Sequence, residues 1–161
     1  KKGCVLEVGS GEGDFILDLS KRFDQVIALD TSKKMLNLSR KKVQEKKLTN
    51  VELVHGDTRL TLERKVIADC ITLNMVLHHT PNPAVIFNDL AGLLAKNGVL
   101  IVTELCRHDQ NWARESCGDL WLGFDPNDLS SWALAAGLHE GESLYLAQRN
   151  GFQIQLRQFC N

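Results

Sequence analysis

The sequence has little proline and tyrosine, and it has no long hydrophobic segment. Of its 161 residues only three are proline and one is tyrosine, and no low-complexity segment is present. This composition excludes a fibrous or largely disordered chain. No apolar segment approaches the roughly 20 residues that a membrane-spanning helix needs. The sequence also shows no basic-then-apolar leader of the kind that would predict secretion. We therefore expect a globular protein of the cytoplasm that does not enter a membrane.

The sequence also lacks an excess of either charge and any regular set of cysteines. Its 19 basic residues nearly balance 20 acidic ones, so bulk charge does not indicate a nucleic-acid-binding protein. The basic cluster within 33–47 has no stacking aromatic residue and is typical of the exposed face of a helix. Five cysteines without a C-x-x-C pair predict neither a disulfide framework nor a metal site.

Strand-like and helix-like segments alternate along the chain. This alternation predicts one α/β domain over residues 1–161, with a doubly wound, Rossmann-like, mostly parallel sheet. Asn150-Gly151 lies between two strand-like segments and predicts a final antiparallel hairpin, which brings the sheet to seven strands. The predicted strands cover 4–8, 25–29, 51–55, 68–73, 99–103, 143–148 and 152–158, and the predicted helices lie near 15–23, 33–47, 83–95 and 126–136. Ligands of such sheets bind beyond the carboxyl ends of the strands.

A glycine-rich turn, Glu7-Val8-Gly9-Ser10-Gly11-Glu12-Gly13, joins the first predicted strand to the first helix. A dinucleotide fingerprint of the form G-x-G-x-x-G would need glycine where Asp14 stands. The carboxylates of this turn would repel a pyrophosphate, but they suit the ammonium and sulfonium groups of S-adenosylmethionine. The turn therefore predicts S-adenosylmethionine as the cofactor. The alternatives are an NAD-binding oxidoreductase and a tight turn that binds no ligand.

With this turn, nearly the whole chain resembles the class I S-adenosylmethionine-dependent methyltransferases. The resemblance extends over segments 28–36, 55–58 and 94–100. It implies that Asp30, 21 positions after Gly9, binds both ribose hydroxyls, and that Asp57 binds the adenine amino group. Without a cofactor, these two acids would cap a helix and form a turn. The predicted cofactor-binding residues are Glu7, Gly9, Ser10, Gly11, Gly13, Asp30, Thr31, Met35, Gly56, Asp57, Thr58 and Asn74.

Two narrower resemblances concern the later part of the chain. Segment 74–83 resembles the vLHH.pdP loop of quinone-biosynthesis-like methyltransferases. Segment 108–138 resembles the methyltransferase half of fusions with ArsR-type winged-helix regulators. The second resemblance implies a longer chain in which an N-terminal region precedes this domain, and nucleic acid would be a partner only through that region. The alternative function is then a cofactor-binding sensor domain of a DNA-binding regulator.

The residues after the fourth and fifth predicted strands are expected to hold the methyl acceptor. Methyl transfer from a sulfonium needs positioning and, where the acceptor must lose a proton, a base. We predict that His78, His79 and Glu104 serve as base or orient the acceptor; the alternative is that they only pack or cap the loops. The N/D-P-P-Y/F motif for methylating amino groups of RNA or protein is absent at 74–77. The predicted function is therefore methyl transfer from S-adenosylmethionine to a small-molecule acceptor, whose identity stays open together with the oligomeric state.

Overall fold

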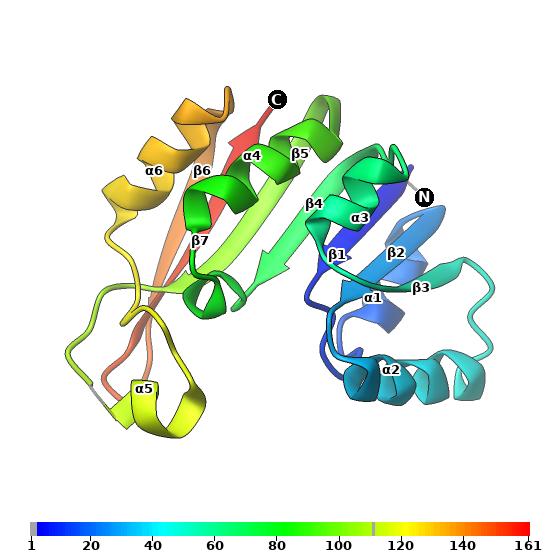
Figure 1. Cartoon of the computed structure of the whole chain (residues 1–161), viewed down its shortest axis with the longest axis horizontal. Coiled ribbons are helices and arrows are strands. Elements are labelled where there is room, and N and C mark those ends of the chain that lie inside the picture. The colour runs from blue at the N-terminus through cyan, green and yellow to red at the C-terminus, as the bar shows by residue number, and fades with distance from the viewer. Residues whose placement is uncertain (1–2, 111) are drawn as a thin grey trace.

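The computed structural model describes residues 3–110 and 112–161 and contains a seven-stranded sheet in the order β3-β2-β1-β4-β5-β7-β6 (Figure 1). Five strands are parallel, and β7 runs antiparallel to both β5 and β6. The strands are β1 (Cys4–Val8), β2 (Gln25–Asp30), β3 (Val51–His55), β4 (Ala68–Asn74), β5 (Leu94–Leu105), β6 (His139–Ala147) and β7 (Gln153–Cys160). The predicted mostly parallel sheet with a terminal antiparallel hairpin is confirmed.

Helices cover both faces of this sheet. The helices are α1 (Ile16–Arg22), α2 (Lys33–Glu45), α3 (Thr58–Glu63), α4 (Pro83–Leu93), α5 (Trp112–Cys117) and α6 (Pro126–Ala135), with a short 3-10 helix η1 (Leu77–His79) after β4. Helices α1 and α2 pack together beside β2 and β3, whereas α4 packs against both α3 and α6. Within the described residues, no helix is both long and apolar enough to cross a membrane.

Alternate residues of β1 enter two separate apolar clusters because side chains of a strand alternate between the faces of the sheet. Leu6 belongs to the larger cluster, which includes Phe87 of α4 and Phe159 of β7. Val5 belongs to the smaller cluster with Leu19 of α1. Strand β1 is therefore buried on both faces, as expected for a central parallel strand.

The position of β1 also creates the crevice in which a ligand can bind. The chain runs outward from β1 to β2 and β3, and then returns to place β4 on the other side of β1. The loops that follow β1 and β4 therefore turn in opposite directions. In doubly wound sheets this switch point, at the carboxyl ends of the strands, is the usual ligand site.

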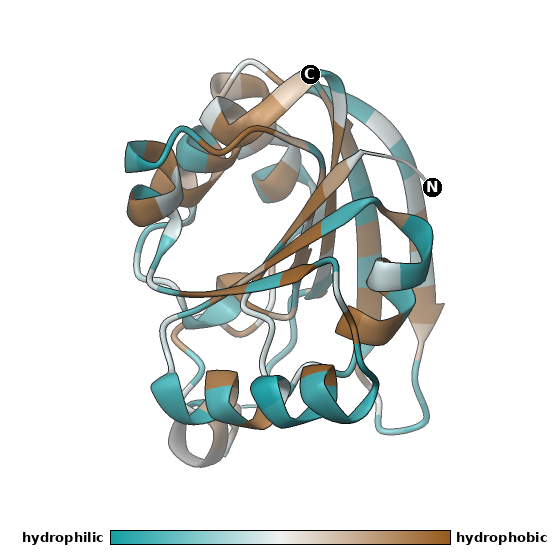
Figure 2. Cartoon of the chain, turned by 90° about the vertical axis from the view of Figure 1, so that its right-hand side faces the viewer, coloured by the Kyte–Doolittle hydropathy of each residue, from teal (hydrophilic) through white to brown (hydrophobic). Residues whose placement is uncertain are grey.

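Local capping explains where two of the helices begin. Ser32 accepts a hydrogen bond from Met35 N at 3.3 Å and caps α2, and Asp57 accepts one from Leu60 N at 3.2 Å and caps α3. Most residues of the basic helix α2 are hydrophilic (Figure 2), and its buried residues are Leu36 and Ser39. This arrangement agrees with the interpretation of segment 33–47 as an exposed helix.

The sequence prediction differs from the structure mainly in short elements. Helices α3 and α5 have six residues each and η1 has three, which is too short for a helical period to show in the sequence. The helix predicted to reach residue 95 ends at Leu93, and residue 94 already belongs to β5. Asp125 stands at the N-cap of α6, but its side chain makes no capping hydrogen bond.

Candidate functional site

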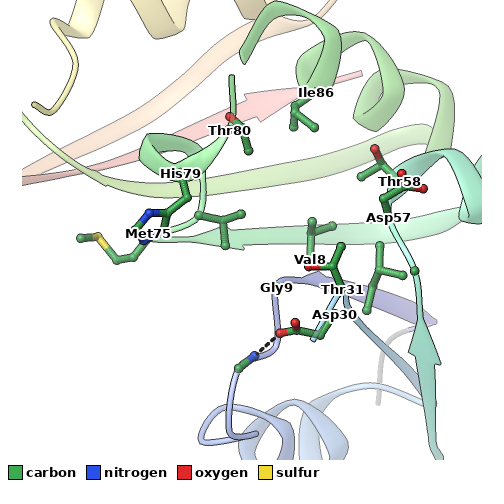
Figure 3. Close-up of a pocket in the computed structure, with 14 residues that line it drawn as sticks. Val8, Gly9, Asp30, Thr31, Asp57, Thr58, Met75, His79, Thr80 and Ile86 are labelled. Carbon is green, nitrogen blue, oxygen red and sulfur yellow. Dashed lines mark hydrogen bonds between the residues drawn. The ribbon is translucent and has the colours of Figure 1, made fainter. Parts of the chain in front are cut away.

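A cavity of about 380 Å³ lies at the carboxyl ends of β1, β2, β3 and β4. Asp57 and Thr58 lie on one side of it, and Met75 and His79, from the loop after β4, lie on the other (Figure 3). The residues that line it are Val8, Gly9, Gly11, Leu29, Asp30, Thr31, Gly56, Asp57, Thr58, Met75, Val76, His79, Thr80 and Ile86. Seven of the twelve predicted cofactor-binding residues are therefore brought to one cavity: Gly9, Gly11, Asp30, Thr31, Gly56, Asp57 and Thr58.

The three glycines of the turn have different surroundings, although all have positive φ. A Cβ on Gly9 would collide with the side chain of Val76, and one on Gly13 would lie 2.9 Å from Ser39 Oγ. Packing within the protein therefore accounts for these two glycines. Gly11 lines the cavity, and no atom lies within 4 Å of the position that its Cβ would take. Gly11 is thus the glycine that leaves room for a ligand beside the backbone.

Asp30 holds the glycine-rich turn against the start of α2. Its Oδ2 accepts a hydrogen bond from Gly11 N at 2.8 Å, which Figure 3 shows as a dashed line, and its Oδ1 accepts one from Ser32 N at 2.8 Å. Each carboxylate oxygen has a second lone pair, so both can still accept a bond from a ligand hydroxyl. Asp57, just beyond the end of the neighbouring strand β3, lines the same cavity.

Glu7 lies in β1 just before the turn, and the residue is only 6% exposed. Burial, and then the negative charges of Asp30 and Asp14, raise the pKa of Glu7 to about 7. Its Oε2 and the Oγ of Ser10 are buried without a hydrogen-bond partner among the described residues. Such uncompensated polar atoms commonly mark the place of a ligand or water. Glu7 and Ser10 do not themselves line the cavity.

The three remaining predicted cofactor residues also lie outside the cavity lining. Gly13 contacts α2 through Ser39, Met35 belongs to the first turn of α2, and Asn74 is exposed at the end of β4. A direct role of these residues in binding stays a prediction.

The predicted acceptor residues form a buried pair beside the cavity. His78 Nδ1 lies 2.6 Å from Glu104 Oε1, and the backbone N of His78 donates to Glu104 Oε2 at 3.2 Å. Glu104 is completely buried. Burial alone would lower the pKa of His78, but the hydrogen bond and charge of Glu104, together with the charge of Asp119, raise it above the usual value. His79 is exposed and lines the cavity.

Asp119 completes this cluster, and the sequence analysis missed it. It is 6% exposed, and its Oδ1 lies 3.6 Å from His78 Nε2 and 3.7 Å from His79 Nδ1. The backbone N atoms of Leu120 and Trp121 both donate to the carbonyl of His78, at 2.9 and 3.2 Å, and hold the loop there. No local pattern in segment 105–124 marks Asp119, so sequence alone offers no signal for it.

The two tryptophans near the acceptor side are placed differently. Trp121 packs against Phe124 and donates from Nε1 to the carbonyl of Thr80 at 2.9 Å. Trp112 is exposed and packs against Phe152 of the segment between β6 and β7. Neither tryptophan lines the cavity, so packing accounts for Trp121.

The chain is similar in sequence to methyltransferases of quinone biosynthesis. It is 29% identical to the demethylmenaquinone methyltransferase of Oceanobacillus iheyensis over 103 residues, which are 62% of this chain and 43% of that protein. It is 25% identical to the ubiquinone biosynthesis O-methyltransferase of Xanthomonas axonopodis pv. citri over 173 residues, covering 98% of this chain and 72% of that protein. The matched region thus spans less than half the length of the demethylmenaquinone methyltransferase.

The fold agrees with a solved methyltransferase structure. The crystal structure of the N-methyltransferase NodS from Bradyrhizobium japonicum, in complex with S-adenosyl-L-homocysteine, matches 99% of this chain and 78% of that chain. The TM-score is 0.80 at 18% sequence identity, so this likeness concerns the fold. A family model described as a methyltransferase domain matches residues 6–102. Because that match covers more than half of the sequence, the chain belongs to the methyltransferase domain family.

Proposed function

We propose that this protein transfers a methyl group from S-adenosylmethionine to a small-molecule acceptor. The observation that carries the proposal is the convergence of Asp30 and Asp57 with the open backbone of Gly11 in one cavity at the switch point of the sheet. An acid at the end of the second strand suits ribose hydroxyls. The bound cofactor supplies an already activated methyl group, so the protein has mainly to bind, orient and exclude water.

The charges around the turn favour this cofactor over a dinucleotide. Asp30 and Asp14 lie near enough to Glu7 for their charges to raise its pKa. A pyrophosphate would add negative charge to this group, whereas an ammonium or sulfonium would offset it. Glu7 Oε2 and Ser10 Oγ, which have no hydrogen-bond partner in the part of the chain that the structure describes, fit the polar, cationic part of S-adenosylmethionine.

We assign the predicted cofactor-binding residues, in the cavity and beside it, to parts of that cofactor. Asp30 accepts hydrogen bonds from the ribose hydroxyls, and Asp57 accepts one from the adenine amino group. Gly11 allows the chain to approach the cofactor closely, and Gly9 lines the same cavity. Thr31, Gly56 and Thr58 surround its nucleoside, and Glu7, Ser10, Gly13, Met35 and Asn74 complete or support the site.

The acceptor side is formed by His78, His79 and Glu104, which orient the acceptor. His79 contributes to the cavity wall, while Glu104 holds the ring of His78 by a 2.6 Å contact. The similarity to demethylmenaquinone and ubiquinone-biosynthesis methyltransferases supports a small-molecule acceptor. That residues 1–161 are one domain of a longer, cytoplasmic protein stays a prediction.

Calorimetric titration with S-adenosylhomocysteine, with NAD as the paired control, tests the proposal. We expect one molecule of S-adenosylhomocysteine to bind per chain with micromolar affinity and no heat from NAD. Binding of NAD, or no binding of S-adenosylhomocysteine, would overturn the proposed cofactor. Turnover of a hydroxylated or amino-bearing acceptor would then separate an enzyme from a sensor that only binds.

A further inference from the structure

Three side chains beside the cavity point donor atoms toward a common position. His78, His79 and Asp119 each offer one ligand atom, and these atoms all lie within 4.8 Å of one another. The ring nitrogens nearest Asp119 are His78 Nε2 and His79 Nδ1, and the second also lies 3.4 Å from the carbonyl oxygen of Gly118. The two contacts to Asp119, 3.6 and 3.7 Å, are too long for hydrogen bonds. The Asp119 carboxylate is buried, and among the described residues the cationic groups within 4.0 Å of it are the rings of these two histidines. Burying a carboxylate is costly unless its charge is compensated, so a cation shared by Asp119 and the two rings would stabilise this arrangement.

The spacing of these atoms fits a metal ion. Zinc binds histidine nitrogen and carboxylate oxygen at about 2.0–2.2 Å, so a tetrahedral ion holds its ligand atoms roughly 3.3–3.6 Å apart. The two contacts of Asp119 are close to that separation. We propose that His78, His79 and Asp119 bind one zinc-class divalent metal ion. Two histidines and one carboxylate leave a fourth position open, as in catalytic zinc sites.

The environment of His78 supports a ligand role. Its Nδ1 is held by the buried Glu104 at 2.6 Å, which leaves Nε2 on the side of Asp119. A carboxylate that holds the second ring nitrogen is the usual partner of a metal-binding histidine, because it sets the ring orientation and tautomer. The backbone bonds from Leu120 and Trp121 to the His78 carbonyl keep Asp119 in place before an ion arrives.

The proposed metal site adds a step to the proposed methyl transfer and rests on that proposal. His79 lines the cavity, so an ion on His79 would lie at the cavity wall and bind a hydroxyl oxygen of the acceptor in its open position. As a Lewis acid it would lower the pKa of that hydroxyl, whose proton leaves to solvent. The oxygen–carbon bond then forms as the sulfur–carbon bond breaks, and the sulfonium becomes a neutral thioether.

Metal binding is tested without cofactor or acceptor. The metal-free protein is titrated with Zn²⁺ by calorimetry and with Co²⁺ by visible absorption, which is strong for a tetrahedral site. The variants are Asp119→Asn, His79→Ala and, as the matched control, Asp109→Asn, which changes an exposed acid of the same segment. We expect one ion per chain, a loss of affinity of about 10–100-fold or more in the first two variants, and no change in the control.

Two outcomes would overturn the site: no binding at one ion per chain, or equal affinity in Asp119→Asn. The second would indicate that the metal binds elsewhere, for instance at the exposed Cys117. S-adenosylhomocysteine affinity is measured on the same samples. Normal cofactor binding without metal binding overturns the metal site alone, whereas metal binding without cofactor binding overturns the proposed function.

Discussion

The cofactor side and the acceptor side of the cavity are built in different ways. On the cofactor side, Asp30 and Asp57 each stand at or just beyond the end of a strand, and the adjacent turn bonds directly to Asp30. On the acceptor side, His78, Glu104 and Asp119 come from three separate parts of the chain and meet only through packing. Because parallel strands bring their carboxyl ends to one edge of the sheet, sequence motifs at those ends predict the cofactor site. The acceptor side depends on contacts that no motif records.

The largest effect is expected where the cofactor side depends on open space. Gly11→Val should reduce S-adenosylhomocysteine affinity by more than about 100-fold, because the new side chain would occupy the room beside the backbone. Gly151→Val is the matched control, since Gly151 also has positive φ and no atom near its Cβ position. Both variants carry similar backbone strain, about 1–2 kcal/mol. Equal affinity of the two variants in calorimetry would show that Gly11 does not face the cofactor.

A substitution on the acceptor side should lower the free energy of unfolding rather than the affinity for the cofactor. Glu104→Gln removes the charge that partners His78 in a buried position, and breaking such a pair costs about 3 kcal/mol. We expect urea denaturation to show this loss while S-adenosylhomocysteine affinity changes less than about twofold. A large loss of cofactor affinity in a folded variant would mean that the two sides are not separable.

Asp30→Ala should weaken the cofactor side directly. The substitution removes the acceptor of the bonds from Gly11 and Ser32 as well as the proposed ribose contacts, and hydrogen bonds to a charged group contribute about 2 kcal/mol. The expected loss of S-adenosylhomocysteine affinity is about 30-fold. Asp24→Ala, at an exposed acid before β2, is the control. Unchanged affinity in Asp30→Ala would remove Asp30 from the binding site.

Glu7 makes the cofactor side sensitive to pH. Its pKa is about 7 in the folded protein and about 4.3 in the unfolded chain, so the folded state binds more protons between these values. The stability contributed by protonated Glu7 is complete below about pH 4.3 and is lost as pH rises through 7. Glu7→Gln should therefore be more stable than wild type by about 3–4 kcal/mol at pH 8.

The same variant should be nearly equal to wild type in stability near pH 4.5, as urea denaturation at both pH values can measure. It should also bind S-adenosylhomocysteine more weakly, because the carboxylate next to the cationic group is lost. Parallel stability profiles of the two proteins across this range would contradict the raised pKa of Glu7. Tighter cofactor binding in Glu7→Gln would contradict its proposed role.

Much of the architecture could be predicted because it follows from local periodicity. The five parallel strands, the hairpin around Asn150-Gly151 and the long helix α2 are confirmed. The elements that escaped prediction, α3, α5 and η1, are too short to show a repeating pattern in the sequence. Asp57 illustrates the difference: it was expected as a cofactor ligand or a turn residue, and it also caps α3.

The sequence by itself determined the order of strands and helices, the glycine-rich turn and the acids at the ends of two strands. These features follow from neighbouring residues, because parallel strands bring their carboxyl ends to one edge. Only the tertiary structure decided that Gly13 packs on Ser39 while Gly11 stays open, and that Asp119 faces His78 and His79. Both outcomes depend on packing between segments that lie far apart in the sequence. At Asp119, backbone hydrogen bonds to His78, rather than a sequence period, set the geometry.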